Sequence, residues 1–135
     1  MNAHDLWLID GFNVLHACIL KGRDRHAWWR AEAQTRVAQW LESFARHHPV
    51  VIVFDAARPD SERCANSGFS ASLRFAADAD AAIVEAVSAA SGRACVVTAD
   101  RSLTDRCKAR GARTLRPWAF DELMASTAGA AGRSR

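Results

Sequence analysis

The chain has 135 residues, 50% of them hydrophobic and 24% charged, with 18 Lys and Arg against 15 Asp and Glu. A chain of this length can bury roughly two-thirds of its unfolded surface, so it predicts one globular domain that needs no disulfide framework. It has no apolar run near the ~18 residues of a membrane span, no basic start typical of a signal peptide and no zinc-site spacing among its cysteines, so we expect a cytoplasmic protein.

The first predicted strand ends in an acid. Apolar residues 6–9 run into Asp10, and Gly11 follows at once, which is typical of a buried strand that ends at a turn. Ligands of open parallel sheets bind at the carboxyl edge of the strands, so Asp10 is a candidate site residue. Asn13 opens a short helix predicted to reach Leu20, and its amide could orient Asp10 or a bound water.

A second strand delivers another acid. Apolar residues recur every three or four positions over 26–46, which predicts an amphipathic helix that Pro49 stops. The wholly apolar run 50–54 then predicts a strand covered on both faces, and it ends at Asp55.

Residues 56–68 carry turn formers without a helical period and predict a loop beside this edge. Its Arg58 and Arg63 are candidate phosphate contacts, with ordinary solvated arginines as the alternative. Alternation over 69–75 predicts a strand with one wet face, at the edge of the sheet, whose direction the sequence leaves open.

A third acid stands at the start of a helix. Asp78 is placed to cap a helix over 79–90, which Gly92 ends. Asp80 lies in the first turn, and because the helix follows the strand so closely, this turn should lie at the carboxyl edge. Complementing the helix dipole is the alternative role for both acids; we favour it for Asp78 and a site role for Asp80.

The fourth acid, Asp100, follows an apolar strand over 94–98. A helix is predicted from about Leu103 to Arg110, and Ser102 with Asp105 fits a capping box at its start, which would make Asp105 structural.

Strands alternating with helices predict an α/β fold of three layers, α/β/α, around a mainly parallel sheet of about five strands. The last elements are a strand over 112–115 and a short helix after Pro117. We expect a single domain over 1–124 and a disordered tail over 125–135, which is rich in Ala, Gly and Ser.

Only the sheet can bring together acids that lie so far apart in the sequence. Carboxylates gathered in one crevice repel one another and raise each other's pKa values unless a cation neutralises them. Mg²⁺ or Mn²⁺ prefers carboxylate oxygens, and it can activate water and stabilise the leaving oxygen of a phosphodiester. The expected metal ligands are Asp10, Asp55, Asp80 and Asp100.

Four motifs carry a family resemblance: Asp10-Gly11-Phe12-Asn13, Val53-Phe54-Asp55-Ala56, Ala79-Asp80-Ala81-Ala82-Ile83-Val84-Glu85 and Val97-Thr98-Ala99-Asp100. In this order they resemble the NYN branch of PIN-like ribonucleases, most closely its YacP-like group, over about residues 6–124. The resemblance implies a PIN-like fold, a divalent-metal site and endonucleolytic cleavage of RNA. It puts these residues in the family's acidic positions: Asp10, Asn13, Asp55, Asp80 and Asp100. Relatives often carry a further acid where this chain has Leu103. The candidate RNA contacts are Arg58, Arg63 and Arg101.

Other classes fit less well. A phosphatase of the haloacid dehalogenase kind needs an acid where this chain has Phe12, and the glycine motifs of nucleotide-binding folds are absent from the sequence. The alternative that stays open is a PIN-like RNA-binding or regulatory domain whose nuclease activity is weak, lost or dependent on a partner such as the ribosome. The retained acids argue against lost chemistry.

Overall fold

The computed structural model describes residues 5–21, 30–57, 59, 61–65 and 68–133, with 127–133 given as backbone only. Five parallel strands form one sheet in the order β3-β2-β1-β4-β5. The strands are β1 (Leu6–Asp10), β2 (Val50–Asp55), β3 (Ser72–Ala76), β4 (Ala94–Val97) and β5 (Arg113–Leu115). The predicted α/β fold is thereby confirmed, and β3 is parallel to β2.

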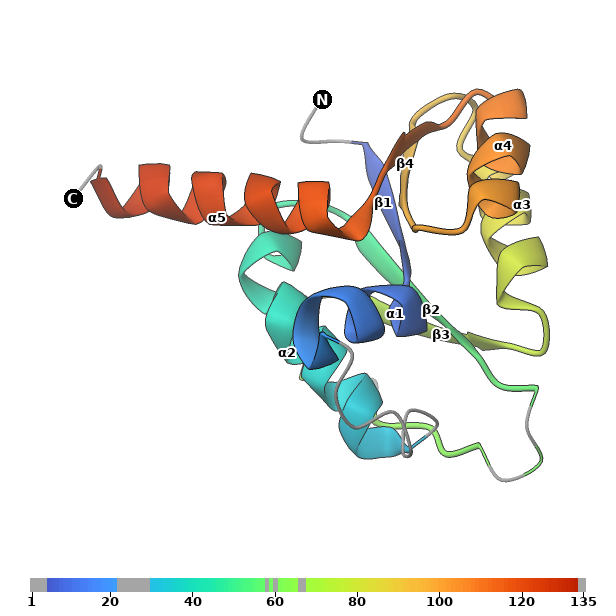
Figure 1. Ribbon diagram of the computed structural model, residues 1–135, viewed down its shortest axis with the longest axis horizontal. Helices are drawn as coiled ribbons and strands as arrows, with labels where there is room; N and C mark the ends of the chain where they lie inside the picture. The colour runs from blue at the N-terminus through green and yellow to red at the C-terminus, as the bar shows by residue number, and fades with distance from the viewer. Residues whose placement is uncertain (1–4, 22–29, 58, 60, 66–67, 134–135) are drawn as a thin grey trace.

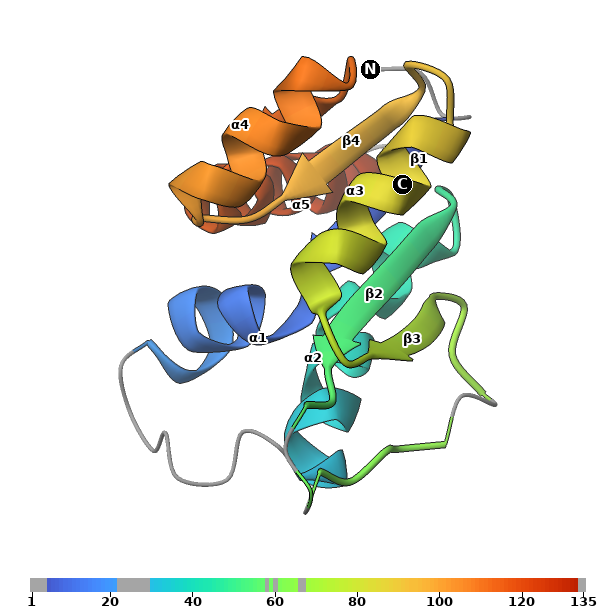
Figure 2. The same cartoon turned by 90° about the vertical axis from the view of Figure 1, so that its right-hand side faces the viewer.

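Helices cover both faces of the sheet, in three layers (Figures 1 and 2). The face of α3 (Ala79–Ala89) and α4 (Arg101–Ala109) is opposite that of the remaining helices. The latter are α1 (Gly11–Val14), the π-helix η1 (Leu15–Leu20), α2 (Ala31–Ala45) and α5 (Pro117–Arg133).

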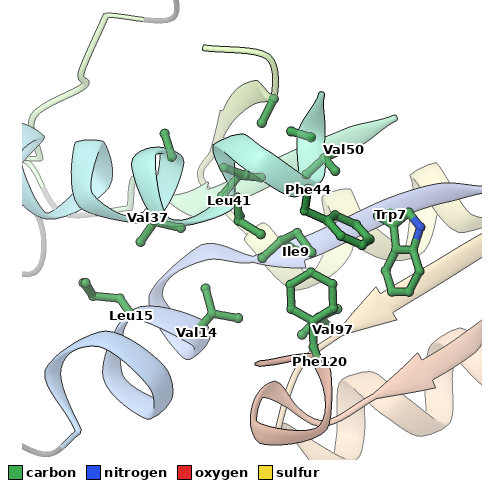
Figure 3. Packing of buried hydrophobic residues seen from close by; sticks show 14 of the residues in the cluster. Trp7, Ile9, Val14, Leu15, Val37, Leu41, Phe44, Val50, Val97 and Phe120 are labelled. Carbon is green, nitrogen blue, oxygen red and sulfur yellow. The ribbon is translucent and has the colours of Figure 1, made fainter. Parts of the chain in front are cut away.

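Alternation along the strands divides the core between these two faces. Trp7 and Ile9 pack toward α2 and α5, where the Trp7 ring lies 5.1 Å from Phe44 and 5.4 Å from Phe120 (Figure 3). Leu8 of the same strand packs with the helices of the other face. Asp10, two residues beyond Leu8, therefore stands on the side of α3 and α4.

The same alternation of side chains between the two faces applies to the neighbouring strands. Val53 of β2 and Val96 of β4 belong to the core cluster of α3 and α4, so Asp55 and Thr98, two residues further on, stand on that side as well. The chain builds β1, β2 and β3 outward and then crosses through α3 to β4 on the other side of β1. The strand order therefore reverses between β1 and β4, which is where open parallel sheets bind ligands.

The loop from β2 to β3 is fastened to α2. The side-chain amide nitrogen of Gln34, a residue only 2% exposed, donates to the Glu62 carbonyl at 2.6 Å. The Gln34 amide oxygen accepts from the Cys64 N–H at 2.8 Å, and Glu42 accepts from the Ser70 N–H at 2.9 Å. These bonds hold a long connection in place without a crossover helix.

Three helix boundaries differ from the prediction. Helix α5 continues to Arg133, where a short helix and a disordered tail from Ala125 were expected. Alanine has the highest helix propensity, so an Ala-rich segment extends a helix whose Leu123 and Met124 pack against the core. The predicted helix over 26–46 is observed as α2 from Ala31; residues 22–29 lie outside the described part of the chain.

The third difference concerns α4, which begins at Arg101 because Asp100 is its N-cap. The Asp100 Oδ1 accepts from the Leu103 N–H at 3.0 Å, so the capping box predicted for Ser102 and Asp105 is wrong. Aspartate is among the best N-cap residues, and this one precedes the predicted box. The predicted cap of α3 is confirmed, since Asp78 accepts from the Ala81 N–H at 3.0 Å.

Among the described residues, no helix has the length and apolar character that a membrane span requires.

Candidate active site at the carboxyl edge of the sheet

An open pocket of about 520 Å³ lies at the carboxyl edge, and its wall combines residues of β1, β2, α1, η1 and α3. Three of the predicted acids line it, namely Asp10, Asp55 and Asp80, together with Asn13. We call it the acidic pocket. Three different elements deliver these carboxylates, so the fold has brought together residues that are far apart in the sequence.

Asp10 is the most deeply placed of these acids. Its pKa is raised from 3.8 to about 6, chiefly by burial; the nearby charges of Asp80 and Asp100 contribute to this rise, and hydrogen bonds from the Thr98 hydroxyl and the Asn13 backbone oppose it. A carboxyl with such a pKa is harder to ionise than an ordinary aspartate in the absence of a cation. The position therefore favours a bound positive charge.

Thr98 links Asp10 to the turn that carries Asp100. Its side chain is only 1% exposed, and its hydroxyl donates to the Asp10 Oδ2 at 2.9 Å and accepts from the Asp100 N–H at 3.1 Å. The hydroxyl proton is thus committed to Asp10. The sequence predicted no role for Thr98, because the sequence alone does not show that β1 and β4 are neighbouring strands.

Asn13 has a different contact from the one predicted. Its side-chain oxygen accepts from the Ala99 N–H at 2.7 Å, so the amide fastens α1 to the turn after β4. Asn13 still lines the acidic pocket, with its side-chain oxygen bonded to this turn.

Asp80 faces further charges from the first turn of α3. Burial raises its pKa first of all, and Asp100, Asp78 and Asp55 add to the rise, while Arg106 of α4 opposes it. The four predicted acids are therefore electrostatically coupled. Arg106 is a cation beside the acids that sequence reasoning missed.

Asp55 and Asp100 each use one oxygen for the local backbone. The Asp55 Oδ1 accepts from the Ala57 N–H at 2.9 Å, and the Asp100 Oδ1 caps α4. Asp100 is coupled to Asp10 and Asp80 but does not line the acidic pocket.

The predicted RNA contacts are separated. The Arg63 guanidinium lies 5.5 Å from the centre of the Phe75 ring and does not line the acidic pocket. Arg101 lines a second pocket beside the acidic one. Arg58 lies outside the described residues.

His16 also lines the acidic pocket and was missed from the sequence. It follows Asn13 by three residues, and Ala17, by four, shares the same wall. Helical neighbours at these spacings share a face, so a search along the helix from Asn13 would have found His16.

Gly11 allows the close approach that positions this wall. A Cβ atom at Gly11 would lie 2.4 Å from the Phe54 ring, whose side chain is fully buried. The same ring packs against Phe12 at 5.1 Å and Phe75 at 5.6 Å. Only glycine fits between Asp10 and this aromatic cluster without displacing it.

The donor set of the pocket suits a hard divalent cation. Asp10, Asp55 and Asp80 offer carboxylate oxygens, which Mg²⁺ and Mn²⁺ prefer. Within the part of the chain that the structure describes, no three His, Cys, Asp or Glu side chains are close enough to hold a metal ion as they stand. Metal binding therefore requires the side chains to move together or water to complete the shell, as is common for Mg²⁺.

The fold and the acidic pocket at its carboxyl edge define a PIN-like nuclease domain. The YacP-like NYN domain matches residues 7–133, and the chain belongs to this family, as the sequence motifs predicted.

Two solved structures are similar over nearly the whole chain. Rae1 (YacP) from Bacillus subtilis matches with a TM-score of 0.74 and 20% identity, covering 96% of this chain and 79% of that one. A tryptophan-to-leucine mutant of Rae1 matches over the same shares and at the same identity, with a TM-score of 0.71. At this identity the similarity shows the fold. No curated protein matches the chain.

Proposed function

We propose that this protein is a divalent-metal-dependent endoribonuclease that cleaves RNA phosphodiester bonds in the acidic pocket. The proposal depends chiefly on one observation, which is that three elements bring Asp10, Asp55 and Asp80 into one open pocket at the switch point of the sheet. Membership of a PIN-like nuclease family supports it.

Mg²⁺ or Mn²⁺ would be held by Asp10, Asp55 and Asp80, and by the Asp100 Oδ2, since only Oδ1 of that carboxylate caps α4. When bound, such an ion lowers the pKa of a water molecule and stabilises the charge that develops on a phosphodiester. The raised pKa of Asp10, about 6, shows that its ionised form is disfavoured in the metal-free pocket. A bound cation would favour the ionised carboxylate.

The other residues of the pocket orient these ligands. Thr98 holds Asp10 by its hydroxyl, and Asn13 fixes the turn that leads to Asp100. His16, on the same wall, is placed to contact the substrate.

The test uses labelled single-stranded RNA and the purified protein. We expect cleavage in Mn²⁺ or Mg²⁺ that stops in EDTA, and loss of cleavage in Asp10→Asn and in Asp80→Asn. Glu85→Gln, which changes an exposed acid on the same helix as Asp80, is the matched control and should cleave normally. Calorimetric titration with Mn²⁺ gives a readout independent of activity, since the Asp10→Asn, Asp80→Asn double variant should bind the ion far more weakly. Cleavage that persists in excess EDTA would contradict the proposal.

The alternative is an RNA-binding or regulatory domain with weak, lost or partner-dependent activity. One observation favours partner dependence: the carboxylates of the described residues do not stand close enough to form a metal site unaided. Bound RNA or a ribosome could draw them together. Cleavage that appears only when purified ribosomes are added would support this alternative, and normal cleavage of free RNA would exclude it.

A further inference from the structure

A second pocket, of about 400 Å³, adjoins the acidic one. It lies between α4 and the chain that leads from β5 into α5, and three cations line it, Arg101, Lys108 and Arg116. One carboxylate, Asp105, shares the lining. We call it the basic pocket.

One face of α4 forms much of this wall. Arg101, Thr104, Asp105 and Lys108 recur at the three- and four-residue spacing of a helix face, whereas Leu103 and Cys107 turn to the core. Thr114, Leu115 and Arg116 complete the wall from β5. The basic pocket is therefore built from two secondary-structure elements and the link after β5.

The cations of this pocket are free for a ligand. Arg101, Lys108 and Arg116 are all exposed, and none of them forms an ion pair with a carboxylate of the described residues. Arg101 is moreover the first residue of α4, where the helix dipole disfavours a cation and favours an anion. An anion in the pocket would satisfy both the dipole and the three side chains.

The two pockets share the turn after β4. Ala99 lines both of them, and Thr98, whose hydroxyl holds Asp10, lines the basic one. The two pockets are therefore neighbours, so a polyanion bound in the acidic pocket can continue into the basic one.

We propose that the basic pocket, through Arg101, Lys108 and Arg116, binds a backbone phosphate of the RNA strand next to the phosphate that is cleaved. This inference rests on the proposed function, since it assigns the path of the same substrate. Arginine and lysine beside threonine hydroxyls are the groups that recognise phosphate oxygens without reading the base.

An exposed aromatic residue follows Arg116 closely in the sequence. Trp118 lies two residues beyond Arg116, in the first turn of α5. It is 62% exposed, and among the described residues it is the one large hydrophobic residue exposed at the surface. Bases of single-stranded RNA stack on such side chains regardless of sequence. The phosphate held by Arg116 would bring a base within reach of this ring.

The test measures RNA binding in EDTA, so that the RNA stays intact, by fluorescence anisotropy over a range of salt concentrations. Because the pocket binds one backbone phosphate, and each neutralised phosphate of a single strand contributes about 0.7 to the slope of log K against log salt, Lys108→Ala, Arg116→Ala should lower the slope by ~0.7 and weaken binding roughly 5-fold at 0.1 M salt relative to 1 M. Arg36→Ala, Arg93→Ala removes two exposed charges outside both pockets and is the matched control.

Two further variants should change binding differently. Asp105→Asn removes the one carboxylate of the basic pocket and should strengthen binding, whereas Trp118→Ala should weaken it and leave the salt slope unchanged. Shortening the RNA from the end that occupies this pocket should weaken binding to the wild type but not to the Lys108→Ala, Arg116→Ala variant. Thermal melts check that each variant is folded.

The outcomes separate the two proposals. Wild-type protein that cleaves RNA while Lys108→Ala, Arg116→Ala binds with an unchanged slope overturns the phosphate site and leaves the nuclease proposal standing. The same applies if the control variant loses as much slope, because the effect would then be one of overall charge. Wild-type protein that neither binds nor cleaves RNA overturns both.

Discussion

Thr98 donates its hydroxyl hydrogen to Asp10 at 2.9 Å, across the two strands between which the order of the sheet reverses. The same oxygen accepts the Asp100 N–H, so one buried hydroxyl fixes the deepest acid of the pocket and the turn that carries the next. The geometry of the acids therefore depends on a residue that carries no charge.

Replacing Thr98 tests this dependence. Thr98→Val keeps the shape but leaves a buried N–H without its acceptor, so we expect it to destabilise the protein by about 1–3 kcal/mol in urea unfolding. The lost donor also raises the pKa of Asp10 above its value of about 6, so the pH profile of cleavage should move to higher pH. Thr98→Ser restores the hydroxyl and should recover both. A Val variant with an unshifted profile would show that the hydroxyl does not tune Asp10.

Stability should depend on pH through Asp10. Its pKa is raised from 3.8 to about 6 on folding, so the native state holds a proton that the unfolded state loses between these values. Metal-free protein should therefore lose stability as pH rises from about 4 to about 6, by ~1.4 kcal/mol per pKa unit of the shift at most. Above pH 6 the loss is complete.

Urea unfolding in EDTA across this range measures the effect. Asp10→Asn removes the titrating group and should be the more stable protein above pH 6, with a flatter pH dependence. Adding Mn²⁺ to the wild type at pH 7 should return stability, because the ion binds the native carboxylates. A wild-type profile as flat as that of Asp10→Asn would contradict the assignment.

The strand ends could be predicted because local signals suffice for them. In β1 and β2 an apolar run stops at an acid, which indicates both a buried strand and the residue at which it ends. The parallel sheet then places Asp10 and Asp55 at one edge. The cap of α3 at Asp78 is likewise a local matter.

Contacts between strands could not be predicted in this way. The roles of Thr98 and Asn13 depend on which strand lies beside β1, and that is fixed by the crossover through α3. The start of α4 was missed because two candidate capping residues, Asp100 and Ser102, lie close together in the sequence, and the structure uses Asp100.

Asp100 has two roles that its variants can separate. Asparagine caps helices about as well as aspartate, so Asp100→Asn should keep the stability of metal-free protein, or raise it, by removing repulsion with Asp10 and Asp80. Cleavage in Mg²⁺ should nevertheless fall by orders of magnitude. Asp100→Ala loses the cap as well and should cost a further ~1 kcal/mol of unfolding free energy. Thermal melts in EDTA and cleavage rates in Mg²⁺ distinguish the two; equal activity of Asp100→Asn and wild type would remove Asp100 from the metal site.

Gly11 offers the most direct test of the packing under the pocket. In Gly11→Ala the new methyl group would lie 2.4 Å from the Phe54 ring, and since that ring is fully buried between Phe12 and Phe75, the ring or the turn after Asp10 must move. Overpacking of this kind costs about 1–3 kcal/mol, which urea unfolding would detect. Cleavage should fall too, because the displaced turn carries Asp10 and Asn13.

Shortening the opposing side chain should relieve the clash. Phe54→Leu alone leaves a cavity and destabilises the protein, but combined with Gly11→Ala it provides room for the methyl group. The double variant should therefore be more stable than the sum of the two single effects predicts, with a coupling energy of ~0.5–3 kcal/mol, the range for residues in contact. Strictly additive effects would mean that the methyl group does not meet Phe54, and that glycine is needed at this position for a different reason.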